Sequence, residues 1–138
     1  MHLTFADLLA DVQVEDKVRK RPSNEEHHIQ CACVRWFRYQ YPHLHSCLFA
    51  VPNGGRRDKT TGAKLKAEGV IAGVSDLILL VQRGGFGGLL IEMKTSKGSQ
   101  STEQKTWQKL VEQQGYRYII CRSLDDFMTK IEAYLNEN

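Results

Sequence analysis

The sequence predicts an α/β fold in which helices flank a central mixed β-sheet. Two nearly all-apolar segments, 77–81 and 89–91, flank a glycine-rich turn centred near Gly84-Gly85, which predicts an antiparallel hairpin. A helical pattern at 101–114 separates this hairpin from a further strand at 116–122, and a helical crossover of this kind joins parallel strands. Because the hairpin strands are apolar on both sides, we expect helices to cover both faces of the sheet.

The length and composition are those of one globular domain. A chain of 138 residues builds a modest single core, and 41% hydrophobic with 25% charged residues is ordinary for a soluble protein. Apolar runs stay well below the roughly 18 residues that span a membrane, and the N-terminus lacks the pattern of a signal peptide. We therefore expect a cytoplasmic protein that does not contact a membrane.

Residues 1–22 are expected to form a separate N-terminal part, and residues 23–138 the main domain. Apolar residues recur at helical spacing between residues 3 and 18, and a run rich in lysine and arginine follows at 17–21. This pattern predicts an appended helix and a basic linker. Packing of the helix on the domain is the favoured role, while a dimer contact or DNA binding stays open.

A helix is expected over residues 23–40, and it carries a candidate metal ligand in its first turn. Glu26 lies three residues after Ser23, the spacing of a capping box, which gives this glutamate a structural role. The same glutamate begins an apolar stripe along the helix, where a carboxylate is costly without a cation or another partner. Metal contact and capping are therefore both open for Glu26, with Glu25 as the alternative in register.

The segment 44–51 is expected to be the first strand. His43, His45 and Cys47 would alternate on one face of it, which raises a zinc cluster as an alternative. We do not expect zinc, because no partner pair at metal-ligand spacing occurs elsewhere in the sequence. The cysteines contain no C-x-x-C pair and are expected to be reduced core residues. They are Cys31, Cys33, Cys47 and Cys121.

Residues 53–73 interleave glycines with basic side chains and lead directly into Asp76. Glycine lets backbone amides approach a phosphate closely, and arginine can hold a phosphate through two hydrogen bonds. A flexible surface loop is the alternative on composition alone. Because the segment passes beside Asp76, we expect it to line the path of a DNA backbone. The candidate DNA-binding residues are Asn53, Arg56, Arg57, Lys59 and Gly73.

Charged residues mark the two ends of the predicted hairpin. Asp76 precedes the first strand, and Glu92-Met93-Lys94 closes the second. If the turn is centred on the two glycines, the position across from Asp76 falls between Glu92 and Lys94, so two carboxylates and one amine meet. Two carboxylates bind a hard divalent cation, and a lysine beside them can orient or deprotonate a water. Two carboxylates and one amine are the smallest set of functional groups that a metal-dependent phosphodiesterase needs.

The final third of the chain is expected to be helix, strand and helix. Ser101 and Gln104 have capping-box spacing at the start of the helix that ends before Gly115. Gln104 also begins the buried stripe of this helix, which follows the strand that carries Lys94. A cap and a role at the site are both open for Gln104. Ser123 is expected to cap the last helix, whose apolar residues are core.

Several motifs resemble the virus-type replication-repair nuclease (VRR-NUC) domain, a branch of the PD-(D/E)XK nucleases. The likeness covers roughly residues 23 to 122. The segments that carry it, in the family's order, are Glu26-His-His-Ile-Gln30, Pro52-Asn-Gly-Gly-Arg56, Gly69-Val-Ile-Ala-Gly-Val-Ser-Asp76, Ile91-Glu-Met-Lys94 and Gln104. The usual proline before the aspartate is Ser75 here, which permits the extended backbone without enforcing it.

The resemblance implies a restriction-endonuclease-like core and a DNA endonuclease that uses Mg²⁺, for which Mn²⁺ can substitute. The implied catalytic residues are Asp76, Glu92, Lys94, which positions or deprotonates the water, and Gln104, which orients Lys94 or that water. The implied metal ligands are Glu26, Asp76, Glu92 and the carbonyl of Met93. Single-domain members of this family act as homodimers on branched DNA such as four-way (Holliday) junctions, which implies a bacterial or phage-infected cytoplasm and a nick that leaves a 5′-phosphate.

Other kinds of protein fit part of the pattern. A non-catalytic DNA-binding module would keep the fold and the basic segment but has no reason to retain Asp76, Glu92 and Lys94 together. A partner-docking protein would need the whole ordered set of motifs to arise by chance. Among nucleases, a preference for flaps or for simple nicking stays open.

Overall fold

The computed structural model describes Thr4 and residues 24–52 and 59–138. None of the helices described there is long and apolar enough to cross a membrane. Outside the described residues lie the predicted N-terminal helix and basic linker, and the roles predicted for Ser23, Asn53, Arg56 and Arg57.

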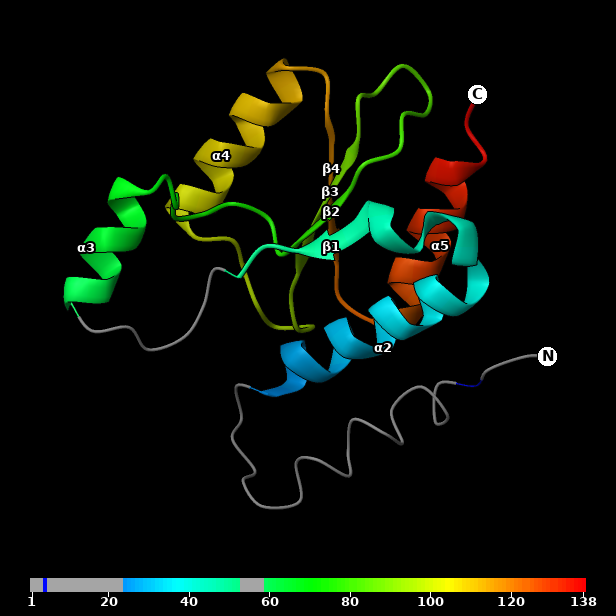
Figure 1. The fold of residues 1–138 in the computed structure, drawn as a ribbon. Coiled ribbons are helices and arrows are strands. Elements are labelled where there is room, and N and C mark those ends of the chain that lie inside the picture. Colours follow the sequence, from blue (N-terminus) through cyan, green and yellow to red (C-terminus); the bar gives the residue numbers. More distant parts are fainter. Residues whose placement is uncertain (1–3, 5–23, 53–58) are drawn as a thin grey trace.

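The described strands form one mixed sheet in the order β1-β2-β3-β4 (Figure 1). They are β1 (Leu48–Ala50), β2 (Leu77–Leu79), β3 (Leu89–Met93) and β4 (Arg117–Cys121). β1 pairs antiparallel with β2, and β2 with β3, whereas β3 and β4 are parallel. The predicted mixed sheet, antiparallel through the hairpin and parallel across the helical crossover, is confirmed.

Helices cover both faces of the sheet, as expected from its apolar strands. In the described part of the chain they are α2 (Asn24–Gln40), α3 (Lys59–Ala67), α4 (Thr102–Gln113) and α5 (Leu124–Leu135), with a 3₁₀ helix, η1, at Pro42–Cys47. α4 lies on one side of the sheet, and α2 and α5 lie on the other (Figure 1). The predicted cap of the last helix is present, because the Ser123 hydroxyl accepts a hydrogen bond from the Asp126 N–H at 3.0 Å.

The main core lies between the sheet and the α2–α5 pair. Trp36 of α2 and Phe127 of α5 meet there edge to face, with ring centroids 6.0 Å apart. The intervening residues of β3, Leu90 and Glu92, point to the opposite face, toward α4. All of β3 is buried. The strand residues that fill the main core are Leu48, Leu77, Leu79, Leu89, Ile91, Met93 and Cys121.

The cysteines are free thiols, as predicted. Cys33 on α2 and Cys121 at the end of β4 are fully buried in the core. Burial raises the pKa of both thiols, to about 12 for Cys121. A thiol that keeps its proton is a poor nucleophile and a poor metal ligand, so these two residues serve packing.

The hairpin between β2 and β3 turns at Gly84-Gly85, as predicted. Both glycines have positive φ, and Arg83 and Phe86 form a bridge on either side of them. Such a turn needs left-handed backbone at its centre, which glycine adopts at little cost.

The register at the far end of the hairpin differs by one residue from the prediction. Leu77 pairs with Ile91, so the next position places Asp76 opposite Glu92 and not opposite the position between Glu92 and Lys94. The two arms are unequal: three residues separate the turn bridge from β2, and two separate it from β3. The extra residue in the first arm moves the ladder by one position.

The prediction of a strand over residues 44–51 was wrong in its first half. η1 occupies that half, and β1 covers only the residues that follow. Pro42 favours the helical start, because its ring fixes φ and its missing N–H loses no bond at the first position. His43, His45 and Cys47 therefore do not alternate on a strand face, which removes the geometric basis of the zinc alternative.

α3 lies in the segment 53–73, for which the sequence analysis did not predict a helix. Its lysine, alanine and leucine residues favour helix strongly enough to tolerate one internal glycine. The helix ends at Ala67, and Gly69, whose φ is 107°, follows it; the Val70 N–H donates to the Leu65 carbonyl at 2.9 Å, as in a glycine C-cap. Lys64 and Lys66 are therefore displayed on an exposed helix and not on a loop.

Candidate active site

The hairpin brings Asp76 and Glu92 to the same end of the sheet. Asp76 directly precedes β2, and Glu92 is the penultimate residue of β3. Opposite residues of an antiparallel ladder point to the same face, so both carboxylates lie on the face toward α4. Lys94 follows two residues later with the same orientation, and its Nζ lies 3.8 Å from Oε1 of Glu92. Three chemically active side chains thus meet at one edge of the sheet.

Glu92 is almost completely buried, with 1% of its surface exposed. Its Oε1 accepts a hydrogen bond from Nε2 of Gln104 on α4, at 2.8 Å. Its Oε2 accepts a hydrogen bond from the hydroxyl of Tyr118 on β4, at 3.0 Å. Because both donors are uncharged, they orient the carboxylate without neutralising it.

Asp76 is half-buried and is fixed by the backbone of the facing strand. Its Oδ2 accepts a hydrogen bond from the Met93 N–H at 2.7 Å. The preceding Ser75 is fully buried, and its hydroxyl donates to the Leu77 carbonyl at 3.1 Å. Serine thus constrains the chain beside Asp76 through a hydrogen bond, where a proline would act by restricting φ.

The site carries an excess of negative charge in a buried place. Burial, and then the charge of Asp76, raises the pKa of Glu92 from 4.5 to about 8. The hydrogen bond from Tyr118 and the charge of Lys94 oppose this effect without cancelling it. A proton or a cation beside Glu92 therefore stabilises the site.

Glu26 flanks the carboxylate pair from the first turn of α2. It is half-buried, whereas Glu25 is exposed, so Glu26 is the one that faces the site. Burial raises the pKa of Glu26, the charge of Lys94 lowers it, and the charge of Asp76 raises it further. Within residues 24–52 and 59–138, no three His, Cys, Asp or Glu side chains lie close enough together to form a metal cage. Glu26 is therefore beside the Asp76–Glu92 pair and does not complete a cage with it.

Gln104 caps α4 and also makes a side-chain contact with Glu92. Its backbone N–H donates to the Ser101 hydroxyl at 3.2 Å, and its Oε1 accepts from the Ser101 N–H at 2.8 Å, which completes the capping box. Its Nε2 is then directed to Glu92. The structure thus places the Gln104 amide on Glu92, whereas the family resemblance had implied contact with Lys94 or a water.

Tyr118 is a site residue that the sequence analysis did not identify. It is the second residue of β4, lies beside Leu90 of β3, and is 7% exposed. Its ring meets Trp107 of α4 edge to face, with centroids 6.2 Å apart. The alternation of β4 predicts that Tyr118 lies on one face of the sheet, but only the pairing with β3 shows that this is the face of Glu92.

Comparison with known proteins identifies the family. A profile of the VRR-NUC domain matches residues 13–125. The chain belongs to the VRR-NUC domain family. A solved structure described as a VRR_NUC domain protein is 26% identical, covers 82% of this chain and 89% of that chain, and has a TM-score of 0.72. No curated protein matches the chain.

Membership in the VRR-NUC family confirms the resemblance seen in the ordered motifs. It also confirms the predicted PD-(D/E)XK-like fold. It implies a nuclease-type function with DNA as the partner, in a family that generally depends on divalent metal. The match begins at residue 13, inside the segment 1–22 that was predicted as a separate N-terminal part. The boundary at residue 23 stays a prediction.

The carboxylates at the end of the hairpin form a suitable binding site for a divalent cation. The available donors are carboxylate oxygens of Asp76 and Glu92, which are the hard ligands that Mg²⁺ and Mn²⁺ prefer. Both oxygens of Glu92 are held by neutral groups, and burial beside Asp76 makes its negative charge costly. A cation would relieve that cost as a proton does, and it would leave the hydrogen bonds to Glu92 in place.

Of the candidate DNA-binding residues, Lys59 and Gly73 lie in the described part of the chain. Lys59 begins α3. Gly73 has a φ of 86°, and a Cβ placed on it would lie 2.7 Å from the Glu103 carbonyl carbon in the first turn of α4. This glycine therefore brings the segment before Asp76 into contact with the helix that carries Gln104, which is a structural reason for a glycine at this position.

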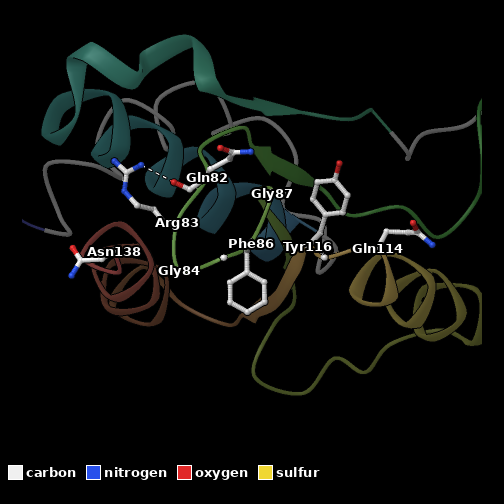
Figure 2. Close-up of a pocket in the computed structure, with 10 residues that line it drawn as sticks. Gln82, Arg83, Gly84, Phe86, Gly87, Gln114, Tyr116 and Asn138 are labelled. Carbon is white, nitrogen blue, oxygen red and sulfur yellow. Dashed lines mark hydrogen bonds between the residues drawn. The ribbon is translucent and has the colours of Figure 1, made fainter.

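A cavity of about 460 Å³ lies at the other end of the hairpin, around the glycine turn (Figure 2). Phe86 and Tyr116 line it, together with Arg83, which donates to the Gln82 carbonyl at 2.7 Å. None of the predicted catalytic or metal-binding residues lines this cavity. The candidate chemistry is therefore separated from it by the length of the β2–β3 ladder.

Proposed function

We propose that this protein is a metal-dependent endodeoxyribonuclease that hydrolyses DNA phosphodiesters with Mg²⁺, for which Mn²⁺ can substitute. The observation that carries the proposal is the buried Glu92, which faces Asp76 across the hairpin and has the Lys94 amine 3.8 Å from its Oε1. A carboxylate pair of this kind is destabilised by its own charge and is suited to a divalent cation.

Each of these residues has its own role in the proposed reaction. Asp76, Glu92 and the Met93 carbonyl would hold the cation, with Glu26 as a further contact. A divalent cation at this position lowers the pKa of a bound water and stabilises the negative charge of the transition state. The Met93 N–H fixes Asp76 through its hydrogen bond at 2.7 Å, so the two strands hold their ligand groups in one geometry.

Lys94 is the proposed residue that positions or deprotonates the attacking water. Its side chain is 13% exposed, so it is confined beside Glu92 but still reaches solvent. Its backbone N–H donates to the Cys121 carbonyl at 3.0 Å, which extends the parallel pairing with β4 to Lys94. Both neighbours of β3 therefore fix the segment that carries Lys94.

The preferred substrate in this proposal is branched DNA such as a four-way junction, cut by a homodimer. The support is the family resemblance, and two-fold symmetry also suits a substrate that needs two matched nicks. A preference for flaps or simple nicking is the alternative within nucleases. A DNA-binding module without catalysis is the alternative outside them.

A cleavage panel tests the proposal. End-labelled single-stranded, duplex, flap and four-way-junction DNA is incubated with the protein in Mg²⁺, in Mn²⁺ and in EDTA. We expect cleavage in either metal, no cleavage in EDTA, and the highest rate on the junction, with 5′-phosphate ends. Binding of all four DNAs without cleavage in either metal would favour the non-catalytic module.

A further inference from the structure

We propose that Tyr118 is a positioning residue that holds Glu92 in its cation-binding orientation. This inference rests on the proposed function, because it concerns the same carboxylate. The Tyr118 hydroxyl donates to Oε2 of Glu92 at 3.0 Å, and the tyrosine comes from β4, a strand that carries none of the other proposed site residues.

Two donors from different elements hold the two oxygens of Glu92. Gln104 on α4 binds Oε1, and Tyr118 on β4 binds Oε2. A glutamate has three side-chain torsions, and one hydrogen bond would leave the carboxylate plane free to rotate. With both oxygens held, the carboxylate has one orientation before any cation arrives, which lowers the entropic cost of binding.

The chemistry of the two donors suits a cation site. An arginine or lysine bonded to Glu92 would neutralise the carboxylate and compete with a metal ion. A phenol and an amide donate hydrogen bonds but leave the negative charge available. The charged neighbour Lys94 stands farther away, at 3.8 Å from Oε1.

Tyr118 is itself held by a short chain of polar groups. Nε2 of Gln100 lies 3.4 Å from the Tyr118 hydroxyl oxygen, and the same nitrogen donates to Oε1 of Gln108 at 2.8 Å. A tyrosine hydroxyl has one hydrogen to donate, and because Gln100 donates to the oxygen, that hydrogen is directed to Glu92. The edge-to-face contact with Trp107 fixes the ring.

The test is Tyr118→Phe, which removes the hydroxyl and keeps the ring. Calorimetric titration of the DNA-free protein with Mn²⁺ is expected to show a Kd raised by roughly tenfold or more, as is usual when a group that orients a metal ligand is removed. Single-turnover junction cleavage should be slow at low Mn²⁺ and should recover most of the wild-type rate at saturating Mn²⁺. The KM for DNA should stay unchanged.

Tyr134→Phe is the matched control. Tyr134 is also a buried tyrosine, and its hydroxyl donates to the Val81 carbonyl in the main core, away from the carboxylates. The Tyr134→Phe variant should be less thermally stable than the wild type, because it lacks this hydroxyl, and should keep the wild-type affinity for Mn²⁺. Thermal melts of both variants, recorded beside the titrations, show that each is folded.

The outcomes separate the inference from the proposed function. Wild-type protein that binds no Mn²⁺ would overturn the proposed metal site and this inference with it. If the wild type binds Mn²⁺ and Tyr118→Phe binds it equally well, only the positioning role is wrong. An equal loss of Mn²⁺ affinity in Tyr134→Phe would show a general structural effect and would also overturn the positioning role.

Discussion

Raising the pH of the cation-free protein should destabilise it, because Glu92 must then ionise in a buried place beside Asp76. These two causes raise the pKa of Glu92 from 4.5 to about 8. Between those pH values the unfolded chain has released this proton while the native state retains it. The stabilising effect of the proton is therefore complete below about pH 4.5 and is lost as the pH rises toward about 8.

The size of the effect follows from the pKa difference. Each pKa unit corresponds to about 1.4 kcal/mol, so Glu92 can remove up to about 5 kcal/mol from the free energy of unfolding across this range. A divalent cation at the carboxylate pair replaces the proton. Added Mg²⁺ should therefore raise the free energy of unfolding more at pH 8 than at pH 5.

Urea unfolding at a series of pH values, in EDTA and in Mg²⁺, measures both effects. Glu92→Gln is the control, because it keeps the shape of the side chain and does not ionise. The free energy of unfolding of Glu92→Gln in EDTA should depend less on pH than that of the wild type, and added Mg²⁺ should not change it. Parallel pH curves for wild type and Glu92→Gln would refute the account of Glu92.

Three further predictions concern neighbouring residues. Lys94→Ala should slow single-turnover cleavage while the calorimetric Kd for Mn²⁺ changes little, since an ammonium is not a metal ligand; lost metal binding with unchanged chemistry would contradict this. Gly73→Ala should lower the free energy of unfolding by more than Gly69→Ala, by about 1 kcal/mol or more in urea titrations, because both glycines have positive φ but only a Cβ on Gly73 meets the Glu103 backbone. Replacing the Arg56-Arg57 pair with alanines should weaken DNA binding and reduce the log-log salt slope by up to about two; an unchanged slope would show that this pair does not contact phosphates.

Turn chemistry and apolar pattern were sufficient to predict the centre of the fold. The glycine pair at the hairpin turn and the apolar strands on each side of it determined which strands pair, and therefore that Asp76 and Glu92 lie together. The register was wrong by one residue because the two arms of the hairpin are unequal in length. The difference matters for the site, because a one-residue shift decides which face a side chain points to, and in the observed register Asp76 and Glu92 point to the same face.

Other features depend on contacts that a local pattern does not contain. η1 replaced the first half of a predicted strand, since Pro42 favours a helical turn even in a segment of mixed strand-like composition. Tyr118 reaches Glu92 through the parallel pairing of β3 and β4, which are joined by a whole helix. Alternation along β4 defines its two faces, but only the assembled sheet shows which face meets α4. Gln104 is the intermediate case, because its cap was evident from spacing and its contact with Glu92 was not.

The measurement that tests the nuclease proposal most directly is single-turnover cleavage of a four-way junction by Asp76→Asn and Glu92→Gln at saturating Mg²⁺. Each change removes an anionic oxygen from the proposed metal site with little change of shape, so we expect each rate to fall by at least ~100-fold while junction binding persists. Asp125→Asn, the same chemical change at an exposed position on α5, should leave the rate unchanged. Wild-type rates from Asp76→Asn or Glu92→Gln would show that the hairpin carboxylates are not the catalytic site.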